Sequence, residues 1–377
     1  MITEVYLRNF KCWRSLSLKA AAITLLTGMN GMGKSSILQA LLILRQSKQS
    51  GELDGGSLLL GGDLVDAGTG VDIFCEDALD ETISIGFSHD SCSPIFYRYE
   101  YDRQADKLEQ IPHDSPAEYA ARKVLESGID LFSDDFFYVQ AERSGPRKMF
   151  PMSESRARRA DFGVRGEYTL HSLKIREHQV LSPSDPRVLT DYGSRLTDQV
   201  DGWLQHVTPG TRLSVELVPS ADIAIGRFSF ERTGDVPTRA YRATNVGFGL
   251  SYVLPVIASL LTARPGGLVF IENPEAHLHP RGQTRLGELA ARAAAANVQV
   301  FVETHSDHFM DGVRISVREN VLQPSSCAFH YFSRHGAVAE IVSPQVDADG
   351  RLSHWPEGFF DQHDENLSKL LAPRFES

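Results

Sequence analysis

Hydrophobic residues near the N-terminus first alternate with polar ones and then follow a helical repeat. Glu4–Phe10 and Leu16–Leu18 alternate as strand residues do, and Ile23–Leu26 is a short apolar run typical of a buried strand. In Ile37–Gln46 the apolar residues recur at helical spacing. The sequence therefore predicts strands that lead into a Gly-rich connection at 27–36, followed at once by a helix.

The middle of the chain predicts short strands and helices. Leu53–Gly70 is rich in glycine and aspartate, which predicts turns joining short strands. The predicted strands are Glu81–Phe87, Ile95–Tyr101 and Lys107–Ile111 as an antiparallel meander, then Phe136–Val139, Leu213–Val218, Ile223–Arg232 and Arg239–Ala243. The predicted helices are Pro116–Ser127 and Tyr192–His206. No heptad repeat long enough for a coiled-coil arm is present.

The last third predicts a parallel sheet. Gly267–Ile271 and Val298–Val302 are buried-strand runs, and Arg281–Ala296 between them has a helical pattern. An apolar helix, Tyr252–Leu261, precedes them, and we expect Pro255 near its first turn, where a missing N–H costs little. Strand–helix–strand spacing predicts parallel strands that present ligands at their carboxyl ends.

The connection at 27–36 has the composition of a phosphate-binding loop. It fits G-x-x-x-x-G-K-[ST], with Gly28, Gly33, Lys34 and Ser35 in place. The glycines allow successive N–H groups to face one anion, and the following helix adds the positive end of its dipole. Lys34 is expected to reach the β and γ phosphates, and the Ser35 hydroxyl to hold Mg²⁺. We expect a nucleoside triphosphate here; a Gly-rich turn before an ordinary helix is the alternative.

Polar residues follow both predicted strands of the last third. Glu272 ends the first strand and Glu303 follows the second. Enzymes that bind a nucleoside triphosphate at a phosphate-binding loop hold Mg²⁺ with a carboxylate just past an apolar strand. Glu272 is therefore the expected metal ligand together with Ser35. Satisfied capping of the strand ends is one alternative, and a metal-dependent nuclease or phosphohydrolase is another. The candidate ligands of that enzyme are Glu272, Glu275, His277, His279, His305, Asp307 and His308.

Other segments admit two interpretations each. The polar residues of 140–146 at a strand end are candidates to touch Mg²⁺ or the attacking water, or they form a capped turn. An aromatic residue within Asn9–Trp13 would either lie over adenine or pack in a hairpin. Residues 143–176 are the most basic part of the chain, and a solvated loop or partner surface is favoured over DNA contact. A second anion site, or a packing turn, is formed by Gly247, Gly249 and Ser251 at a helix start.

Composition narrows the class of protein. The 377 residues carry a formal net charge of −11, which argues against a wholly basic nucleic-acid binder. The four cysteines include no C-x-x-C pair, so neither a zinc finger nor a disulfide framework is indicated. No apolar run approaches the ~20 residues of a membrane span, and the N-terminus has no signal-like segment. We therefore expect a cytoplasmic protein without a membrane contact.

Taken in order, these motifs resemble those of ABC-type ATPases, closest to the SMC/RecF/OLD-like branch that is often described as AAA-family ATPases. The matching segments are 28–35, Gly247–Ser251, Ile271–Glu275 and Thr304–Ser306. The beginning, Leu-Arg-Asn-Phe-Lys, is also similar. His-Leu-His-Pro at 277–280 and the tail Trp355–Asp361 look like a bacterial group with a small C-terminal domain of unknown function.

The resemblance implies roles for the matching residues. Lys34 and Ser35 would be the Walker A pair, Glu272 the Walker B acid and His305 the switch histidine. The nucleotide-binding residues would be Asn30, Gly31, Gly33, Lys34, Ser35 and Ser36 from the loop, Gln140 as a Q-loop glutamine, and Gly247, Gly249 and Ser251 as a signature motif acting on a partner's ATP. His279 would belong to the dimer contact. ATP and Mg²⁺ are the implied cofactors, and a head-to-tail homodimer is the implied assembly.

Asn273 departs from the family pattern, because many ABC ATPases have their general-base glutamate there. An amide cannot take a proton near neutral pH. Glu272 directly ends its strand and suits the metal, so Glu275 is the expected base and Glu303 a further candidate. The expected catalytic residues are thus Glu272, Glu275 and His305, and hydrolysis should be slow.

The expected fold is α/β, a P-loop NTPase of ABC-head type. A parallel sheet carries an antiparallel β layer, a helical and β insertion, and a small C-terminal α+β appendage. The expected domains are an N-terminal lobe at 1–114, an inserted subdomain at 115–245, a catalytic lobe at 246–325 and a C-terminal domain at 326–377. In the tail, Trp355, Phe359 and Phe360 would either dock a partner or pack on the core.

The leading functional hypothesis is an ATPase whose dimer gates an effector. The resemblance points to DNA repair or phage defence, with a nuclease-like effector on a separate chain. A metal-dependent nuclease and a non-hydrolysing ATP-dependent scaffold are the alternatives.

Overall fold

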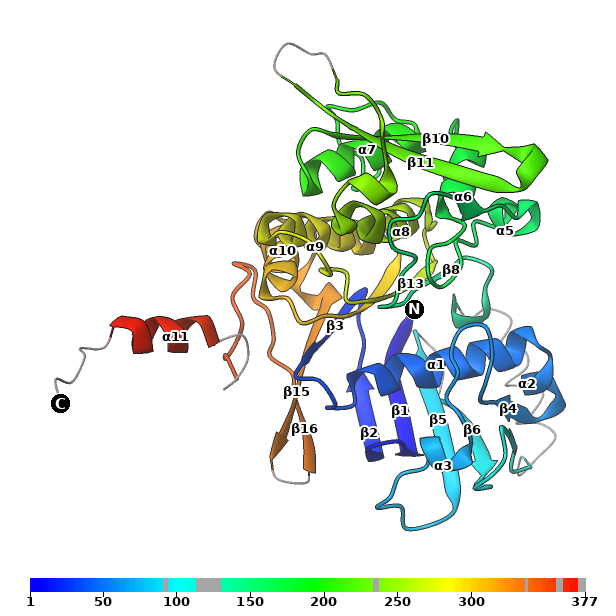
Figure 1. Ribbon diagram of the computed structural model, residues 1–377. Helices are drawn as coiled ribbons and strands as arrows, with labels where there is room; N and C mark the ends of the chain where they lie inside the picture. Colours follow the sequence, from blue (N-terminus) through cyan, green and yellow to red (C-terminus); the bar gives the residue numbers. More distant parts are fainter. Residues whose placement is uncertain (91–93, 113–129, 233–236, 336–337, 357–361, 372–377) are drawn as a thin grey trace, which may run out of the picture.

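A central sheet organises the molecule. The computed structural model describes residues 1–90, 94–112, 130–232, 237–335, 338–356 and 362–371. The sheet runs through the middle of Figure 1 in the strand order β16-β15-β3-β14-β13-β8. Its strands are β3 (Ile23–Gly28), β8 (Phe136–Val139), β13 (Leu268–Glu272), β14 (Gln299–Glu303), β15 (Cys327–His335) and β16 (Val338–Val342).

The strands of the central sheet are parallel except where β15 pairs with β16. The predicted parallel sheet is therefore confirmed. In the register, Glu272 lies opposite Glu303, and Glu303 lies opposite Leu26. Because β3, β14 and β13 end at one edge, the segments that follow them meet there.

Both faces of the central sheet are covered, which explains why its strands are continuous apolar runs. Val300 and Val302 belong to one core and Phe301 to the other, as the two-residue period of a strand requires. The covering helices are α8 (Phe248–Thr262), α9 (Pro280–Ala295) and α10 (Asp307–Arg318) on one face and α1 (Lys34–Gln49) on the other. Figure 1 shows the two groups of helices on opposite sides.

An antiparallel sheet backs α1, as expected. Its order is β2-β1-β5-β6, with bounds β1 (Ile2–Phe10), β2 (Trp13–Lys19), β5 (Thr82–His89) and β6 (Ile95–Glu100). The short elements beside it are α2 (Glu52–Gly55), β4 (Ser57–Leu59), α3 (Gly70–Ile73) and β7 (Lys107–Glu109). The predicted meander is confirmed only in part at its third strand, because β7 pairs with β4 in a separate two-stranded sheet, whereas Gln110 after β7 forms an isolated antiparallel bridge with Tyr99 of β6. Leu58 and Leu108 lie opposite each other and are both buried, so burial decides this pairing.

The insertion forms a lobe above α8 and α9 in Figure 1. Its elements are β9 (Phe150–Pro151), α5 (Glu154–Arg158), α6 (Thr169–Ile175), α7 (Leu196–Val207), β10 (Thr211–Val218), β11 (Ile223–Phe230) and β12 (Tyr241–Arg242). Strand β11 pairs with β10, β12 and β9, always antiparallel. The predicted strands and the later helix are present with adjusted ends. The helix predicted at Pro116–Ser127 lies outside the described residues.

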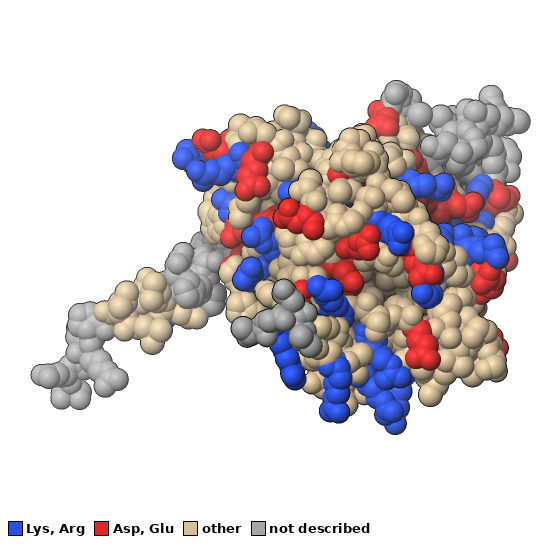
Figure 2. Space-filling view, turned by 90° about the horizontal axis from the view of Figure 1, so that it is seen from above, with Lys and Arg blue, Asp and Glu red and all other residues tan. Residues whose placement is uncertain are grey.

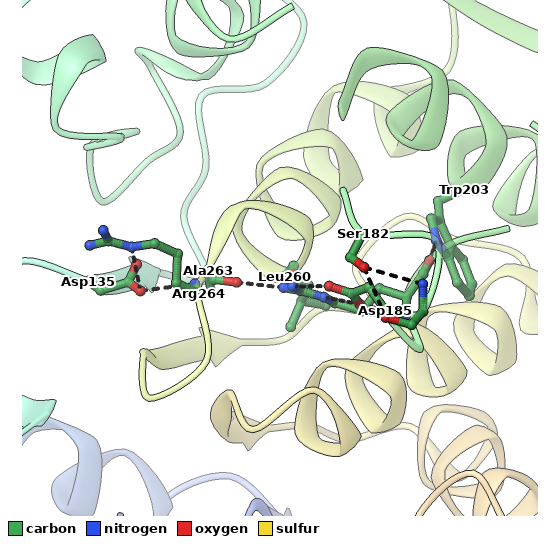
Figure 3. Close-up of polar contacts among 9 residues, drawn as sticks. Asp135, Ser182, Asp185, Trp203, Leu260, Ala263 and Arg264 are labelled. Atoms are coloured by element: carbon green, nitrogen blue, oxygen red, sulfur yellow. Dashed lines mark hydrogen bonds and ion pairs between the residues drawn. The ribbon is translucent and has the colours of Figure 1, made fainter. Parts of the chain in front are cut away.

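A buried arginine ties this lobe to the end of α8. Arg187 donates to the carbonyl oxygens of Leu260 (2.8 Å) and Ala263 (2.6 Å), and pairs with Asp185 at 2.7 Å. Figure 3 shows the polar chain that runs from Asp185 past Leu260 and Ala263. The last carbonyl groups of a helix have no partner within the helix, so Arg187 satisfies them and anchors α8 from its C-terminus.

Pro255 lies inside α8, and not in the first turn where we expected it. The helix begins at Phe248, earlier than the predicted Tyr252, so the turn at Gly247 leads directly into it. The proline ring fills the space beside Gly166, where an added Cβ would lie 2.6 Å from the Cβ of Pro255. This proline therefore packs α8 against the insertion.

The segment expected as a C-terminal appendage shares the central sheet. Strand β15 pairs with β3, so the expected boundary at 325/326 falls just before a strand of that sheet. Phe329 packs in one core and Phe332 in the other, which explains why β15 inserts there. Helix α11 (Gln362–Leu371) is drawn clear of the body in Figure 1. Trp355 is partly exposed over Arg314, and Phe359 and Phe360 lie outside the described residues.

Candidate functional site

The connection between β3 and α1 has the backbone of an anion-binding loop. Gly28, Gly31 and Gly33 have φ angles of 122°, 76° and 86°, which favour glycine over other residues. A Cβ at Gly28 would lie 2.2 Å from the carbonyl oxygen of Phe332 on β15. Gly33 caps α1 in the left-handed conformation and leaves the first N–H groups of the helix facing outward. A negative group is favoured at this point.

A cavity of about 290 Å³ opens over this loop. Its lining residues are Lys11, Cys12, Asn30, Gly31, Gly33, Lys34, Ser35, Ser36 and Glu303. The structure thus brings together the six loop residues that the sequence singled out for the nucleotide. The buried Lys34 ammonium donates to the carbonyl oxygens of Gly28 (2.8 Å) and Met29 (2.6 Å), and burial lowers its pKa.

The aromatic residues of the first hairpin are packed. Phe10 and Trp13 are both buried. The Trp13 indole N–H donates to the carbonyl oxygen of Gly33 at 3.2 Å, and its ring meets Phe332 edge-on. Trp13 therefore packs against the phosphate-binding loop. This agrees with the alternative that an aromatic residue within Asn9–Trp13 packs in the hairpin and does not lie over adenine.

Glu303 meets the loop directly. Its Oε1 accepts a hydrogen bond from the Ser35 hydroxyl at 2.9 Å. The residue is only 7% exposed, and its Oε2 has no hydrogen-bond partner among the described residues. Burial raises the pKa of this carboxyl, and Glu272 and Glu275 nearby add to the rise. A buried oxygen without a partner is costly, and an ordered water or a bound cation would relieve that cost.

Glu272, at the end of β13, faces β8, which is the neighbour of β13 on the side away from β14. Its Oε1 accepts from the Tyr138 hydroxyl at 2.8 Å, and its Oε2 accepts from the Ala141 N–H at 3.1 Å. Burial, and then Glu272, raises the pKa of Tyr138, so the phenol stays the donor. Ser35 and Glu272, the two metal ligands expected from the sequence, make no hydrogen bond to each other among the described contacts, and their shared role stays a prediction.

Glu275 and His305 hold each other across the turns after β13 and β14. The Oε1 of Glu275 accepts from the His305 N–H at 2.8 Å, and Oε2 accepts from the Thr304 hydroxyl at 2.7 Å. Burial and Lys34 lower the pKa of His305, so the imidazole is neutral near pH 7. Because both of its carboxylate oxygens already accept hydrogen bonds, the Glu275 side chain lacks the mobility that a general base needs. Its role as the base stays a prediction.

Arg143 belongs to the strand-end segment 140–146 that the sequence put forward as a candidate, but the sequence assigned it no role of its own. It is buried, and its guanidinium donates to the carbonyl oxygens of Glu272 and, at 2.9 Å, of Asn273. It also lies over the Tyr252 ring of α8. Burial lowers its pKa to about 10, which leaves it charged at neutral pH. The sequence gives no sign of the specific role of Arg143, because its partners are backbone atoms of the distant turn after β13.

Residues 247–251 at the start of α8 differ in their exposure to solvent. Gly247 is exposed, and an added Cβ would meet nothing within 4 Å. At Gly249 the same atom would lie 2.6 Å from the carbonyl oxygen of His277, so this glycine packs on the turn after β13. Ser251 is buried in a small cavity beside Ser144. Phe248 is 56% exposed. None of residues 247–251 lines the cavity over the phosphate loop among the described residues.

Gln140 is partly exposed at the end of β8. Its side-chain amide donates to the carbonyl oxygen of Glu142 at 3.0 Å, and its backbone N–H donates to Val164. Within this chain it is therefore engaged in a local turn.

The ligands of the rival nuclease hypothesis are not gathered. Within the described ranges no three His, Cys, Asp or Glu side chains lie as a metal ion would require. His279 instead caps α9 by accepting from the Arg281 N–H at 3.3 Å, and Asp307 accepts from the N–H of His308 at 2.7 Å. This geometry favours the capping alternative for those residues.

The basic segment 143–176 pairs with acidic neighbours. Arg156 contacts Asp161 at 3.0 Å, and Arg158 contacts Glu154 at 2.7 Å. Figure 2 shows basic and acidic side chains interspersed on one face, with a group of basic ones along one margin. Paired surface charges agree with a solvated or protein-binding surface better than with a DNA contact. None of the helices described is long and apolar enough to cross a membrane.

Comparisons with known proteins agree with this geometry. Residues 23–311 match the family described as "AAA domain, putative AbiEii toxin, Type IV TA system", and residues 322–370 match "Protein of unknown function (DUF3696)". No curated protein matches the chain.

Solved structures of SMC heads have a similar fold. An SMC head bound to the C-terminal winged-helix domain of ScpA aligns with 14% identity, 92% coverage of this chain, 98% coverage of that chain and a TM-score of 0.54. An SMC head domain from Thermotoga maritima has 13% identity, coverages of 92% and 99%, and a TM-score of 0.46. A Pyrococcus furiosus SMC head with an extended coiled coil, bound to the C-terminal domain of ScpA, has 12% identity, coverages of 98% and 99%, and a TM-score of 0.49.

Proposed function

Because the chain belongs to the AAA-domain family that its residues 23–311 match, and has the fold of an SMC-type ABC head, we propose that it binds and hydrolyses ATP with Mg²⁺. The observation that carries this proposal is the loop after β3. Its three glycines with positive φ, the Lys34 ammonium and the start of α1 converge on one cavity. That set suits the polyphosphate of a nucleotide.

The residues around the cavity also suit the metal ion that accompanies ATP. Ser35, Glu303 and Glu272 offer the oxygen ligands that Mg²⁺ prefers, and the unpartnered Oε2 of Glu303 supports a cation nearby. Ser35, Glu303 and Glu272 would hold this ion, which would supply positive charge against the charge that develops on the phosphates. Lys34 would leave the carbonyl oxygens of Gly28 and Met29 to bind the phosphates. Neutral His305 keeps one ring N–H, which would donate a hydrogen bond to the γ-phosphate.

The proposed ATPase works as a head-to-tail homodimer. The turn at Gly247 is exposed and lies outside the loop cavity, so the start of α8 has no phosphate to meet within its own chain. A second copy could place its γ-phosphate there, at the positive end of the α8 dipole. Gly249 packs the same turn on His277, which links this contact to the segment after β13.

The dimer is proposed to gate an effector protein, in DNA repair or phage defence. The similar SMC head was solved with a protein partner, which supports the expectation of a partner here. A nuclease-like effector on a separate chain remains our working hypothesis. We keep the four-part division at 114/115, 245/246 and 325/326 as a proposal, with the last part completing the central sheet through β15.

A non-hydrolysing scaffold is the second candidate. Asn273 favours it, because an amide occupies the position of the usual base, and Glu275 is engaged with His305. Release of phosphate from ATP by wild-type protein, abolished in Lys34→Ala, would exclude the scaffold.

The test of the proposed function is nucleotide binding by matched lysine variants. Lys34→Ala should abolish ATP binding, because the ammonium that faces the phosphates is lost. Lys48→Ala is the control, since it removes the same charge from the other end of α1, where Lys48 pairs with Asp54. Equilibrium binding of labelled ATP measures the affinity of each of the two variants. Equal affinity of the two variants would contradict the proposal.

A further inference from the structure

Strand β8 is the outer strand of the central sheet at the end away from β16. In Figure 1 it lies between α1 and the helices α5 and α6 of the insertion. Asp135, just before β8, accepts an N–H of β13 at 3.0 Å. Because the backbone groups of a strand alternate between its two sides, those of Phe136 and Tyr138 face away from β13. Gln140, the next residue of this outward set, donates its N–H to the carbonyl oxygen of Val164 at 3.0 Å.

The outward backbone groups of Phe136 and Tyr138 are open. They have no hydrogen-bond partner among the described residues, and all four residues of β8 line a cavity of about 520 Å³. Tyr138 is only 9% exposed, and unpaired backbone groups on so buried a residue are costly unless something in the cavity bonds them. An outer strand with open N–H and C=O groups is a template for a further strand.

The same cavity contains a buried arginine that keeps unused donors. Arg45 of α1 is 5% exposed, and its guanidinium lies 3.9 Å from the centre of the Phe136 ring. Its Nη1 donates to the carbonyl oxygens of Leu131 and, at 2.9 Å, of Ser133. Its Nε and Nη2 bond no described residue. Burial lowers the pKa of Arg45 to about 10, so the group is charged at neutral pH and favours an acceptor of opposite charge.

Most acidic side chains of this cavity already have partners. The acidic lining residues are Asp63, Asp134, Asp161 and Glu167. Asp63 and Asp161 contact Arg156 at 3.8 and 3.0 Å, and Glu167 accepts a backbone N–H at 3.0 Å. Arg159, which also lines the cavity, is exposed and forms no ion pair with a described residue. Arg45 and Arg159 together therefore outweigh Asp134, and an acidic group is favoured between them.

We propose that an extended peptide segment of a partner protein adds to β8 as a further strand and places an acidic side chain against Arg45. The open groups of Phe136 and Tyr138 bond its backbone, which gives affinity, and the arginine selects its side chain. Docking in this way needs no nucleotide. Only the identification of the segment with the proposed effector rests on the proposed function. In that case docking acts on the site through Tyr138, whose hydroxyl donates to Glu272.

The test begins with a library of random eight-residue peptides displayed on phage and selected on the nucleotide-free protein. We expect the selected peptides to combine β-branched residues with an acidic one. Each is synthesised again in two forms, with N-methyl groups on one or the other set of alternate residues. Because only one set of N–H groups can face β8, one form should bind at least about tenfold more weakly and the other should bind as the parent does. At 100 times its Kd, the parent should slow hydrogen exchange of the Tyr138 N–H about 100-fold.

Arginine variants test the side-chain contact. Arg45→Gln should weaken binding of the selected peptides about 10–100-fold, because a charge-assisted hydrogen bond is lost. Arg159→Gln, at an exposed position of the same cavity, should weaken it about two- to fivefold. Arg14→Gln, exposed on β2, is the matched control and should bind as wild type does. Thermal unfolding checks that Arg45→Gln is folded, since Arg45 also bonds two carbonyl oxygens of its own chain.

Three results would overturn the docking site. They are a library that yields no binding peptide, equal losses in the two N-methylated forms, and unchanged affinity in both Arg45→Gln and Arg159→Gln. All of these measurements are made without nucleotide, so such a failure would leave the proposed ATPase standing. Failure of the Lys34→Ala test would in turn leave the docking site standing.

Discussion

Replacing Gly247 with aspartate should stabilise one subunit and prevent the assembly of two. Gly247 is the N-cap of α8, with φ −60° and ψ 144°, a conformation open to any residue. An added Cβ meets nothing within 4 Å. An aspartate there can accept a hydrogen bond from the first turn of the helix, which glycine cannot. The free energy of unfolding of the monomer should therefore rise by a few tenths of a kcal/mol.

The effect on the proposed dimer has the opposite sign. A carboxylate at position 247 would face the γ-phosphate bound at the partner's loop, about 4 Å away if the two meet as proposed. At an effective dielectric constant of about 20, two like charges at that distance repel by about 4 kcal/mol. ATP-dependent dimerisation should weaken by roughly a thousandfold.

Light scattering with and without ATP measures the mass of the particle that each variant forms. Urea unfolding measures the free energy of unfolding of its monomer. Gly247→Asn is the matched control, because asparagine caps a helix as well as aspartate and carries no charge. The Asn variant should dimerise with ATP and the Asp variant should remain a monomer. Equal dimerisation of the two would refute the idea that this turn faces a phosphate. Gly249 is unsuitable for the test, because its Cβ would press on the His277 carbonyl within the same subunit.

Two further predictions concern the turns after the central strands. Arg143→Met should lower the free energy of unfolding by about 2–4 kcal/mol, because two partly buried carbonyl oxygens lose a charged donor. Urea unfolding measures this against the surface control Arg165→Met, and a loss below about 1 kcal/mol would contradict it. Glu275→Gln should retain ATP binding and lose most turnover, because an amide cannot take a proton and has one acceptor oxygen in place of the two that accept from the Thr304 hydroxyl and the His305 N–H. Phosphate release at saturating ATP checks this, and near-normal turnover would point to another base.

The sequence alone determined those features that depend on neighbouring residues. The loop at 27–36 was predictable because glycine, lysine and serine at fixed spacing set the local backbone and its charge. Six residues expected there line one cavity. The apolar runs of β13 and β14 were predictable because strands covered on both faces have no polar side. The polar strand ends followed from the same pattern.

The tertiary structure decided which of these segments meet. Strand β7 pairs with β4 and β15 with β3, because each pairing buries apolar residues that lie far apart in sequence. No local pattern encodes such a choice. In the same way, Arg143 finds its partners among the backbone atoms of the turn after β13.

The strand order also decided the contacts of the two acids. In sequence, Glu272 and Glu303 both end an apolar strand and are equivalent candidates for the metal. Only the placement of β14 between β3 and β13 sets Glu303 against Ser35 and turns Glu272 toward β8. Sequence spacing determines where along a strand a carboxylate lies, whereas its neighbour across the sheet is set by the packing of the whole chain.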